Sequence, residues 1–198
     1  WPAVLESVFV SLAGIIDTYM VSSMGTYAVA ATGLIIQPKF LSLSFFFAIN
    51  VAVSALVARR LGQNNRRNAN QVLVTALMMI VLLCVVLTVV TVIFANPLIA
   101  ICGSNADTHE GAVIYFRMIQ VGMIFNVLSL VINAAQRGAG NTKIAMITNV
   151  TSSIVNIIFN YLLIGGNFGF PKWGLFGAAF ATVLGTVFAC AMSVHSLF

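Results

Sequence analysis

Long apolar runs alternate with short polar segments along this chain, and each run has about the length of a membrane span. A helix that crosses a bilayer needs roughly 20 mostly apolar residues. Segments of this kind occur at about 3–24, 33–58, 71–97, 110–135, 143–165 and 174–198. Strand-type alternation long enough for a membrane barrel does not occur in the sequence. The pattern therefore predicts an all-α, polytopic transmembrane helix bundle with six spans.

Turn-forming residues separate these segments. Gly, Asn and Pro gather at 24–25, 61–65, 138–141 and 165–171, which predicts short loops between helices. The segment from Asp107 to Glu110 is typical of a helix N-cap followed by an acidic third position. Pro38 is expected to kink or start the second span.

Composition supports a membrane location. The chain is 61% hydrophobic and 7% charged, whereas soluble domains carry about 25% charged residues. No GxxxxGK[ST] phosphate loop and no HExxH motif occurs, so we expect no enzymatic activity and no cofactor. The cysteines and histidines lack metal-ligand spacing. The sequence begins without Met and ends inside an apolar run, so we expect a longer polypeptide.

The basic residues predict the orientation. Six of nine lie at 59–70 and 136–143, and the positive-inside rule makes these two loops cytoplasmic in a multi-pass protein of the plasma (inner) membrane. We interpret the arginines as topological signals rather than as a nucleic-acid site. Lys39 precedes Arg59 by 20 residues, or about 30 Å of helix, which places it at the outer boundary.

Asp17 is the carboxylate that lies deepest within a predicted span. Charged side chains at membrane depth are costly and usually mark ion or substrate pathways. Asp17 is eight residues before Gly25, so it lies about 12 Å below the outer surface. Glu6 precedes it by 11 residues, close to three helical turns, so both carboxylates project from nearly one face.

The fifth span carries a stripe of polar side chains. Asn149, Ser153, Asn156 and Asn160 follow one another at intervals of four, three and four residues, so they share one helical face. Asn156 and Asn160 lie about 14 and 8 Å below the outer surface, so they can meet Asp17 at one level.

Two interpretations of this stripe remain open. Carboxylate and amide oxygens are hard donors suited to sodium, and a carboxyl group can equally load and release a proton, so Asp17, Asn156 and Asn160 are candidates for a coupling site. Alternatively, the amides hydrogen-bond helix to helix and have only a packing role. Glu6, Asn149, Ser153 and Asn50 are candidates for a secondary polar cavity.

Several stretches together resemble the multidrug and toxic compound extrusion (MATE) transporters. They are Pro2 with Asp17-Thr-Tyr-Met-Val21, Met24-Gly25, Ala28-Val-Ala-Ala-Thr-Gly-Leu34, Ala58-Arg-Arg-Leu-Gly62, Gln136-Arg-Gly-Ala-Gly-Asn-Thr-Lys143 and Gly177-Ala-Ala-Phe-Ala-Thr182. The resemblance covers essentially the whole chain and rests on the order and spacing of these motifs.

The resemblance implies a twelve-helix antiporter with two six-helix lobes, of which residues 1–198 form the N-terminal lobe. It implies export of cationic amphipathic compounds in exchange for sodium or protons, with Asp17, Asn156, Asn160 and Thr182 as the cation site. Some members of the family have a second acid at the position of Asn160, and some have Tyr at that of Ala13. The missing second acid leaves sodium and proton coupling both open, and Ala13 removes one possible hydrogen bond to the site.

Two other functions remain as alternatives. A lipid-linked saccharide flippase of the same superfamily needs a cavity rich in basic residues, and none of the nine here is placed clearly at mid-membrane by the sequence. A non-transporting membrane scaffold or channel subunit would use the polar stripe for packing alone. The expected partners are the lipid bilayer, a small cationic substrate and a C-terminal lobe of the same polypeptide.

Overall fold

All regular secondary structure in the described part of the chain is helical. The structure, a computed structural model, describes residues 2–197, with side chains for residues 4–197. The helices are α1 (Pro2–Ser22), α2 (Thr26–Leu34), α3 (Ile36–Gly62), α4 (Arg66–Ile93), α5 (Ala95–Ile101), α6 (Ala106–Gly138), α7 (Thr142–Gly165), the short 3₁₀ helix η1 (Asn167–Gly169) and α8 (Gly174–His195). Six stretches are long and apolar enough to cross a membrane. The predicted all-α polytopic bundle is therefore confirmed.

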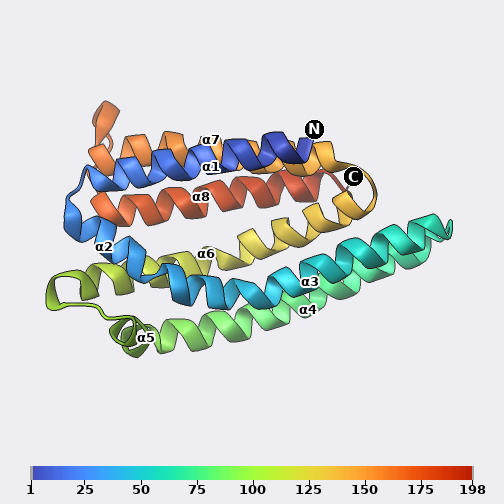
Figure 1. Cartoon of the computed structure of the whole chain (residues 1–198), viewed down its shortest axis with the longest axis horizontal. Helices are drawn as coiled ribbons and strands as arrows, with labels where there is room; N and C mark the ends of the chain where they lie inside the picture. Colours follow the sequence, from blue (N-terminus) through green and yellow to red (C-terminus); the bar gives the residue numbers. More distant parts are fainter. Residues whose placement is uncertain (1, 198) are drawn as a thin grey trace.

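The long helices form two layers with α6 between them. Helices α1, α7 and α8 lie together in one layer, α3 and α4 in the other, and α6 contacts both α8 and the α3–α4 pair (Figure 1). Helix α6 is the most buried of the spans. It therefore provides the surface on which the two layers meet.

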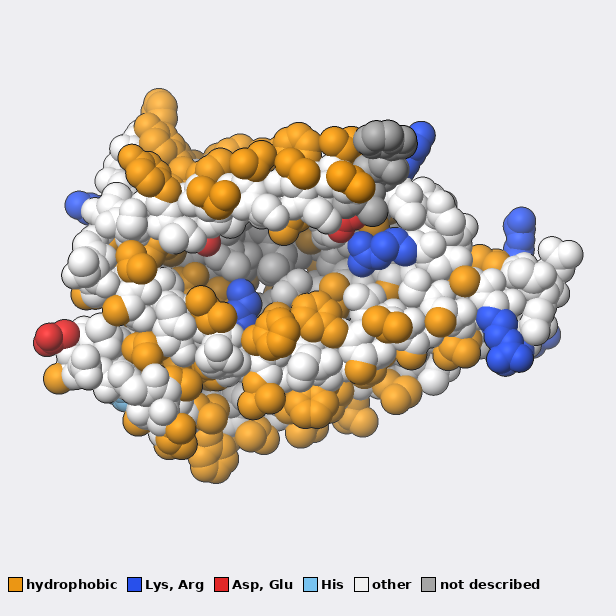
Figure 2. Space-filling model, viewed as in Figure 1, with side chains coloured by type: hydrophobic (Ala, Val, Ile, Leu, Met, Phe, Trp, Pro, Cys, Tyr) orange, Lys and Arg blue, Asp and Glu red, His pale blue; other side chains and the backbone are white. Residues whose placement is uncertain are grey.

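The core is apolar, and so is most of the outside. Phe46, Ile80 and Phe116 are fully buried between the layers, while large apolar side chains such as Val51, Met78 and many others remain exposed. Figure 2 shows apolar side chains over both outer edges of this face. In a bilayer, an apolar exterior faces lipid tails and needs no further cover.

Glycines permit close helix contacts. A Cβ atom built on Gly138 of α6 would lie 2.4 Å from the backbone oxygen of Ser54 in α3, and one built on Gly177 of α8 would lie 2.8 Å from that of Leu163 in α7. Larger residues would force these helix pairs apart, as is common where small residues line membrane helix interfaces.

The second predicted span, 33–58, begins too late. Helix α2 starts at Thr26, and the chain turns at Ile35 before α3 continues to Gly62. Pro38 lies in the first turn of α3, where its missing N–H leaves no intrahelical bond unmade. The prediction that Pro38 starts a helix is correct. The predicted span omitted most of α2, a nine-residue helix too short to cross a membrane by itself.

The third predicted span, 71–97, and the predicted N-cap also need correction. Helix α4 runs from Arg66 to Ile93, and residues 95–97 belong to α5. Pro97 cannot continue α4, because its ring would meet the carbonyl four residues earlier. The cap of α6 is Asn105, whose side chain and that of Thr108 form a reciprocal capping box. Asp107 and Glu110 therefore lie inside the helix.

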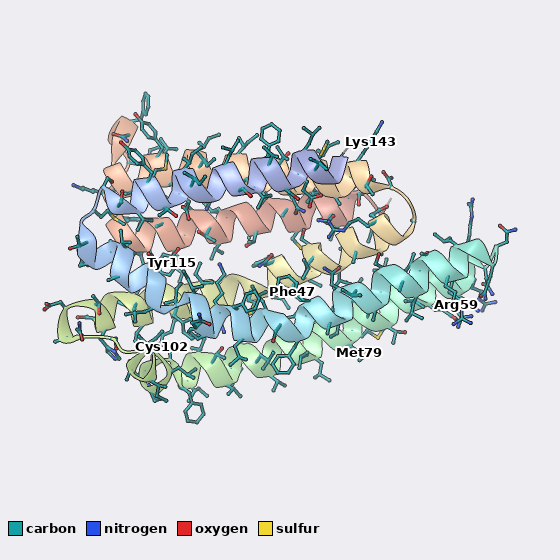
Figure 3. All side chains as sticks on the ribbon, in the orientation of Figure 1. Phe47, Arg59, Met79, Cys102, Tyr115 and Lys143 are labelled. Carbon is teal, nitrogen blue, oxygen red and sulfur yellow. The ribbon has the colours of Figure 1, made fainter. Side chains whose placement is uncertain are left out.

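The two arginine-rich loops lie at the same end of the bundle. The turn between α3 and α4 and the turn between α6 and α7 are at the right of Figure 1, away from the α1–α2 and α7–α8 connections. Arg59 and Lys143 mark these two regions in Figure 3. The charges of 59–70 and 136–143 are thus concentrated at one end.

A polar cluster between α1, α7 and α8

The centre of the candidate site is a hydrogen bond between α1 and α7. Asn160 donates from its Nδ2 to a carboxylate oxygen of Asp17. Asn160 is completely buried, whereas Asp17 is partly accessible. The Oδ1 atom of Asn160 is buried and has no hydrogen-bond partner among the described residues. A buried hydrogen-bond acceptor without a donor costs free energy. This oxygen is therefore suited to bind either a cation or a hydrogen-bond donor.

Asn156 and Thr182 extend this contact to α8. The Oδ1 atom of Asn156 lies 3.3 Å from Nδ2 of Asn160, and its own Nδ2 donates to Oγ1 of Thr182 at 3.2 Å. Thr182 in turn donates to the backbone oxygen of Ala178 at 3.0 Å. The structure therefore brings together all four residues expected at the cation site.

The close approach of α7 and α8 fixes this geometry. A Cβ atom on Gly185 would lie 3.0 Å from the backbone oxygen of Ser152 and 3.2 Å from Cβ of Asn156. The hydroxyl of Ser152 donates to the backbone oxygen of Gly185 at 2.8 Å. Glycine at this position lets α8 approach closely enough for Thr182 to accept from Asn156.

Two further side chains face the carboxylate of Asp17, and the sequence did not assign either to the site. Tyr115 of α6 is buried and interacts with Asp17 and Thr182. In Figure 3 its label lies between α6 and α8. Lys39 of α3 interacts electrostatically with Asp17. Asp17, Lys39 and Tyr115 line one cavity of about 270 Å³.

The expected position of Lys39 at the outer membrane boundary is therefore wrong. The nine residues of α2 precede α3, so the end of this span opposite the arginine-rich loops is near Thr26, and Lys39 lies 13 residues further along the chain, inside the span. Figure 2 shows acidic and basic side chains together along the hollow between the two layers. The sequence feature that could have indicated this position is that Lys39 lies inside a continuous apolar segment.

A second polar cluster lies nearer the arginine-rich end. Asn149 donates to Oε1 of Glu6 at 2.5 Å, and Nη1 of Arg137 lies 3.3 Å from the same oxygen. Ser153 bonds only to the backbone oxygen of Asn149. The side chain of Asn50 makes no hydrogen bond with any described residue, so the structure does not connect it with this cluster.

The two clusters repeat one relationship between α1 and α7. Glu6 bonds with Asn149 and Asp17 bonds with Asn160. In each pair the acid and the amide are 143 residues apart in the chain. The acids are 11 residues apart on α1, and the amides are 11 apart on α7. Parallel helices with this spacing align their polar faces along about three turns.

The chemistry of the Asp17 cluster is that of a hard-oxygen site. One carboxylate, two amide oxygens and a hydroxyl meet at one place, and such ligands suit cations like sodium rather than soft or transition metals. No group of three or more His, Cys, Asp and Glu side chains gathers within the described residues. The three cysteines are free thiols in separate parts of this structure.

The fold and the cluster define a class: a helical, multi-pass membrane protein whose spans enclose a polar, oxygen-rich site. The MatE family model matches residues 2–162. The chain belongs to this family, the multidrug and toxic compound extrusion (MATE) family, and the resemblance inferred from the sequence is confirmed.

Relatives in the family carry transporter names. The chain is 32% identical over 187 residues to the probable multidrug resistance protein YoeA of Bacillus subtilis, which covers 94% of this chain and 40% of YoeA. It is 27% identical over its whole length to a probable multidrug resistance protein NorM of Thermotoga maritima, covering 42% of that protein. It is 29% identical over 91% of its length to an FAD transporter of Shewanella oneidensis, covering 40% of that protein.

Solved structures show the same fold. A MOP superfamily transporter from Pyrococcus furiosus, described as having a binding pocket of reverse polarity, matches the whole chain with a TM-score of 0.90 and 28% identity. A MATE transporter in complex with MaD3S matches with a TM-score of 0.92 and 27% identity. The chain spans 43–44% of the length of these two structures and about two fifths of the relatives named above.

Proposed function

We propose that this chain provides the ion-coupling lobe of a secondary active efflux transporter, which exports cationic amphipathic drugs or metabolites in exchange for sodium or protons. Asp17, Asn156, Asn160 and Thr182 bind the coupling ion. The chain acts as an N-terminal lobe beside a C-terminal lobe of the same polypeptide, and substrate binds between the two lobes. No enzymatic step is required.

The observation that carries this proposal is the unpaired Oδ1 of Asn160. Its Nδ2 already donates to Asp17, and within the described part of the chain its carbonyl oxygen has no donor although the residue is completely buried. A packing network would satisfy both ends of the amide. A site that alternately holds and releases a cation leaves an acceptor open for it.

The proposed location is the plasma (inner) membrane. The concentration of Arg59, Arg60, Arg66, Arg67, Arg137 and Lys143 at one end supports a cytoplasmic position for loops 59–70 and 136–143. Asp17 then lies in the outer half of the bilayer. The apolar exterior supports the bilayer as the principal partner.

A second candidate is export of an anionic metabolite. Lys39 places a positive charge in the same cavity as Asp17, and one relative is named an FAD transporter. Lys39 is the single basic residue along that cavity among the described residues, which falls short of the basic lining that the flippase alternative requires. The transporter names of the relatives disfavour the scaffold alternative.

Reconstitution into liposomes tests both candidates. The protein, purified at its natural full length, is reconstituted into liposomes that are loaded with either a cationic or an anionic fluorescent dye. Efflux of the dye is recorded under an imposed sodium gradient, an imposed proton gradient, or neither. We expect gradient-driven movement of the cationic dye. Preferential movement of the anionic dye supports the second candidate, and equal rates with and without gradients contradict ion coupling.

A further inference from the structure

Lys39 and Asp17 share a cavity without touching. Among the described residues, Arg137 and Glu6 are the only oppositely charged side chains within 4.0 Å of each other, so the ammonium of Lys39 lies further than this from the Asp17 carboxylate. The two groups nevertheless interact electrostatically. The side chain of Lys39 makes no hydrogen bond with any described residue, although its backbone N–H donates to the oxygen of Ile35 at 3.0 Å. The ammonium therefore shares a cavity and an electrostatic interaction with the carboxylate but is not fixed to it.

Lys39 also borders a second, smaller pocket between α3, α6 and α8, called the inner pocket here. This inner pocket is lined by Lys39, Gln120, Asn126, Thr182 and Thr186 among other residues. Its free volume is about 30 Å³, and a site needs roughly 10–15 Å³ to hold one water molecule. The inner pocket can thus take an ammonium group or a water molecule, but it cannot take a drug-sized substrate.

Gln120 gives the inner pocket a free acceptor. Its Nε2 donates to Oγ1 of Thr91 at 2.7 Å and to Oγ of Ser42 at 3.3 Å. These bonds fix the amide, and its Oε1 is buried without a partner among the described residues. Gln120 is completely buried. An ammonium donor would satisfy this oxygen.

We propose that Lys39 is a tethered competitor of the coupling cation: its ammonium rests near Asp17 when the site is free, and moves to the inner pocket beside Gln120 when a cation binds Asp17. The four-carbon stem of lysine provides the movement. This inference rests on the proposed function, because it assumes that Asp17 binds the coupling cation.

The physical reason is charge balance at membrane depth. A carboxylate that has lost its cation in the low-dielectric centre of a bundle carries a large penalty. Lys39 supplies a replacement charge that never leaves the protein. The same charge opposes cation binding, so it weakens the affinity of the site and speeds release of the ion. Thr182 belongs to both sites, since it accepts from Asn156 and lines the inner pocket.

Equilibrium binding of radioactive sodium to the purified full-length protein in detergent tests this proposal. Lys39→Met removes the competitor, and we expect it to tighten sodium binding roughly tenfold, within the usual range of coupling between sites. Lys39→Arg should keep the weak affinity of the wild type. Lys39→Gln should tighten sodium binding as Lys39→Met does. It is the substitute for Lys39→Met if Lys39→Met folds poorly. Unchanged or weaker sodium binding in the neutral variants overturns the proposal.

Gln120→Leu separates movement from simple charge repulsion. In the presence of Lys39 it removes the alternative acceptor, so the ammonium should remain longer at Asp17 and sodium should bind more weakly. In the Lys39→Met background the same change should have no effect, which a double-mutant cycle detects. An effect of equal size in both backgrounds overturns the role of the inner pocket.

Two controls distinguish this inference from the proposed function. Lys172→Met removes an exposed positive charge and should leave sodium binding unchanged. Asp17→Asn should abolish saturable sodium binding. Binding that depends on Asp17 but is indifferent to Lys39 overturns only the competitor role. Absence of sodium binding in both the wild type and Lys39→Met also overturns the competitor role. Gradient-driven efflux in liposomes then shows independently whether the transporter function holds.

Discussion

Asn160 donates one end of its amide to Asp17 and leaves the other end, Oδ1, buried without a partner among the described residues. This arrangement separates two tasks within one side chain. The N–H group fixes the carboxylate in position, and the carbonyl oxygen stays available beside it. An open acceptor of this kind is what the proposed cation site requires, whereas a helix–helix contact with every polar atom satisfied would lack it.

Neutralising Asp17 should stop coupling without unfolding the protein. Asp17→Asn keeps the size of the side chain and its capacity to accept from Asn160, but it removes the charge on which an ion gradient acts. We expect gradient-driven efflux from liposomes to fall severely while the melting temperature stays near that of the wild type. A purely structural role predicts the reverse, with normal efflux in Asp17→Asn.

Asn160→Ala and Asn156→Ala should weaken the apparent affinity for the coupling ion with a milder loss of maximal rate. Each removes one oxygen ligand, whereas Asp17→Asn removes the charge. Efflux measured over a range of sodium concentrations separates the two effects. Ser153→Ala is a matched control on the same face of α7, because its hydroxyl bonds only to the backbone of its own helix. Equal changes in all three variants would argue against specific ligands.

Glu6 should contribute to stability rather than to coupling. It accepts from both Asn149 and Arg137, and its side chain is only 16% exposed. Glu6→Ala leaves these two donors without their shared acceptor, so we expect a loss of about 1.5–3 kcal/mol, the range for hydrogen bonds to a charged group. Thermal unfolding in detergent measures the loss. Unchanged stability together with lost efflux would instead place Glu6 in the transport pathway.

The sequence predicted the parts of this lobe that depend on periodicity. A fixed rise per residue places Asp17, Asn156 and Asn160 at one depth, and helical spacing puts the amides on one face. Lys39 and Tyr115 could not be found this way, because their proximity to Asp17 depends on how α3 and α6 pack against α1. The position of Lys39 depended in addition on α2, which lengthens the span before α3 and is too short to be recognised as part of a span from its length alone.

Gly185 should be required for the contact between α7 and α8. Gly185→Ala adds a Cβ atom within 3.0 Å of the Ser152 backbone oxygen, and that backbone cannot move without displacing the helix. We expect a lower melting temperature and weaker ion binding, because Thr182 moves away from Asn156. Gly14→Ala is the matched control in α1, since an added Cβ meets no atom within 4 Å. Helix propensity predicts that this control is neutral or slightly stabilising. A stable Gly185→Ala variant with normal ion binding would contradict the close-contact argument.

The orientation of the bundle can be measured by labelling from outside the cell. Asn65 and Asn105 cap α4 and α6 with their side chains, so a cysteine at either position would weaken a helix end. Their exposed neighbours Gln63 and Asp107 are better sites for single cysteines, introduced after Cys84, Cys102 and Cys190 have been replaced. The arginines at 59–70 predict that Gln63 faces the cytoplasm. An impermeant maleimide applied to intact cells should therefore label the cysteine at 107 and leave the cysteine at 63 unlabelled, while both react after the membrane is permeabilised. Labelling of position 63 alone in intact cells would reverse the orientation, and it would place Asp17 in the cytoplasmic half of the bilayer instead of the outer half.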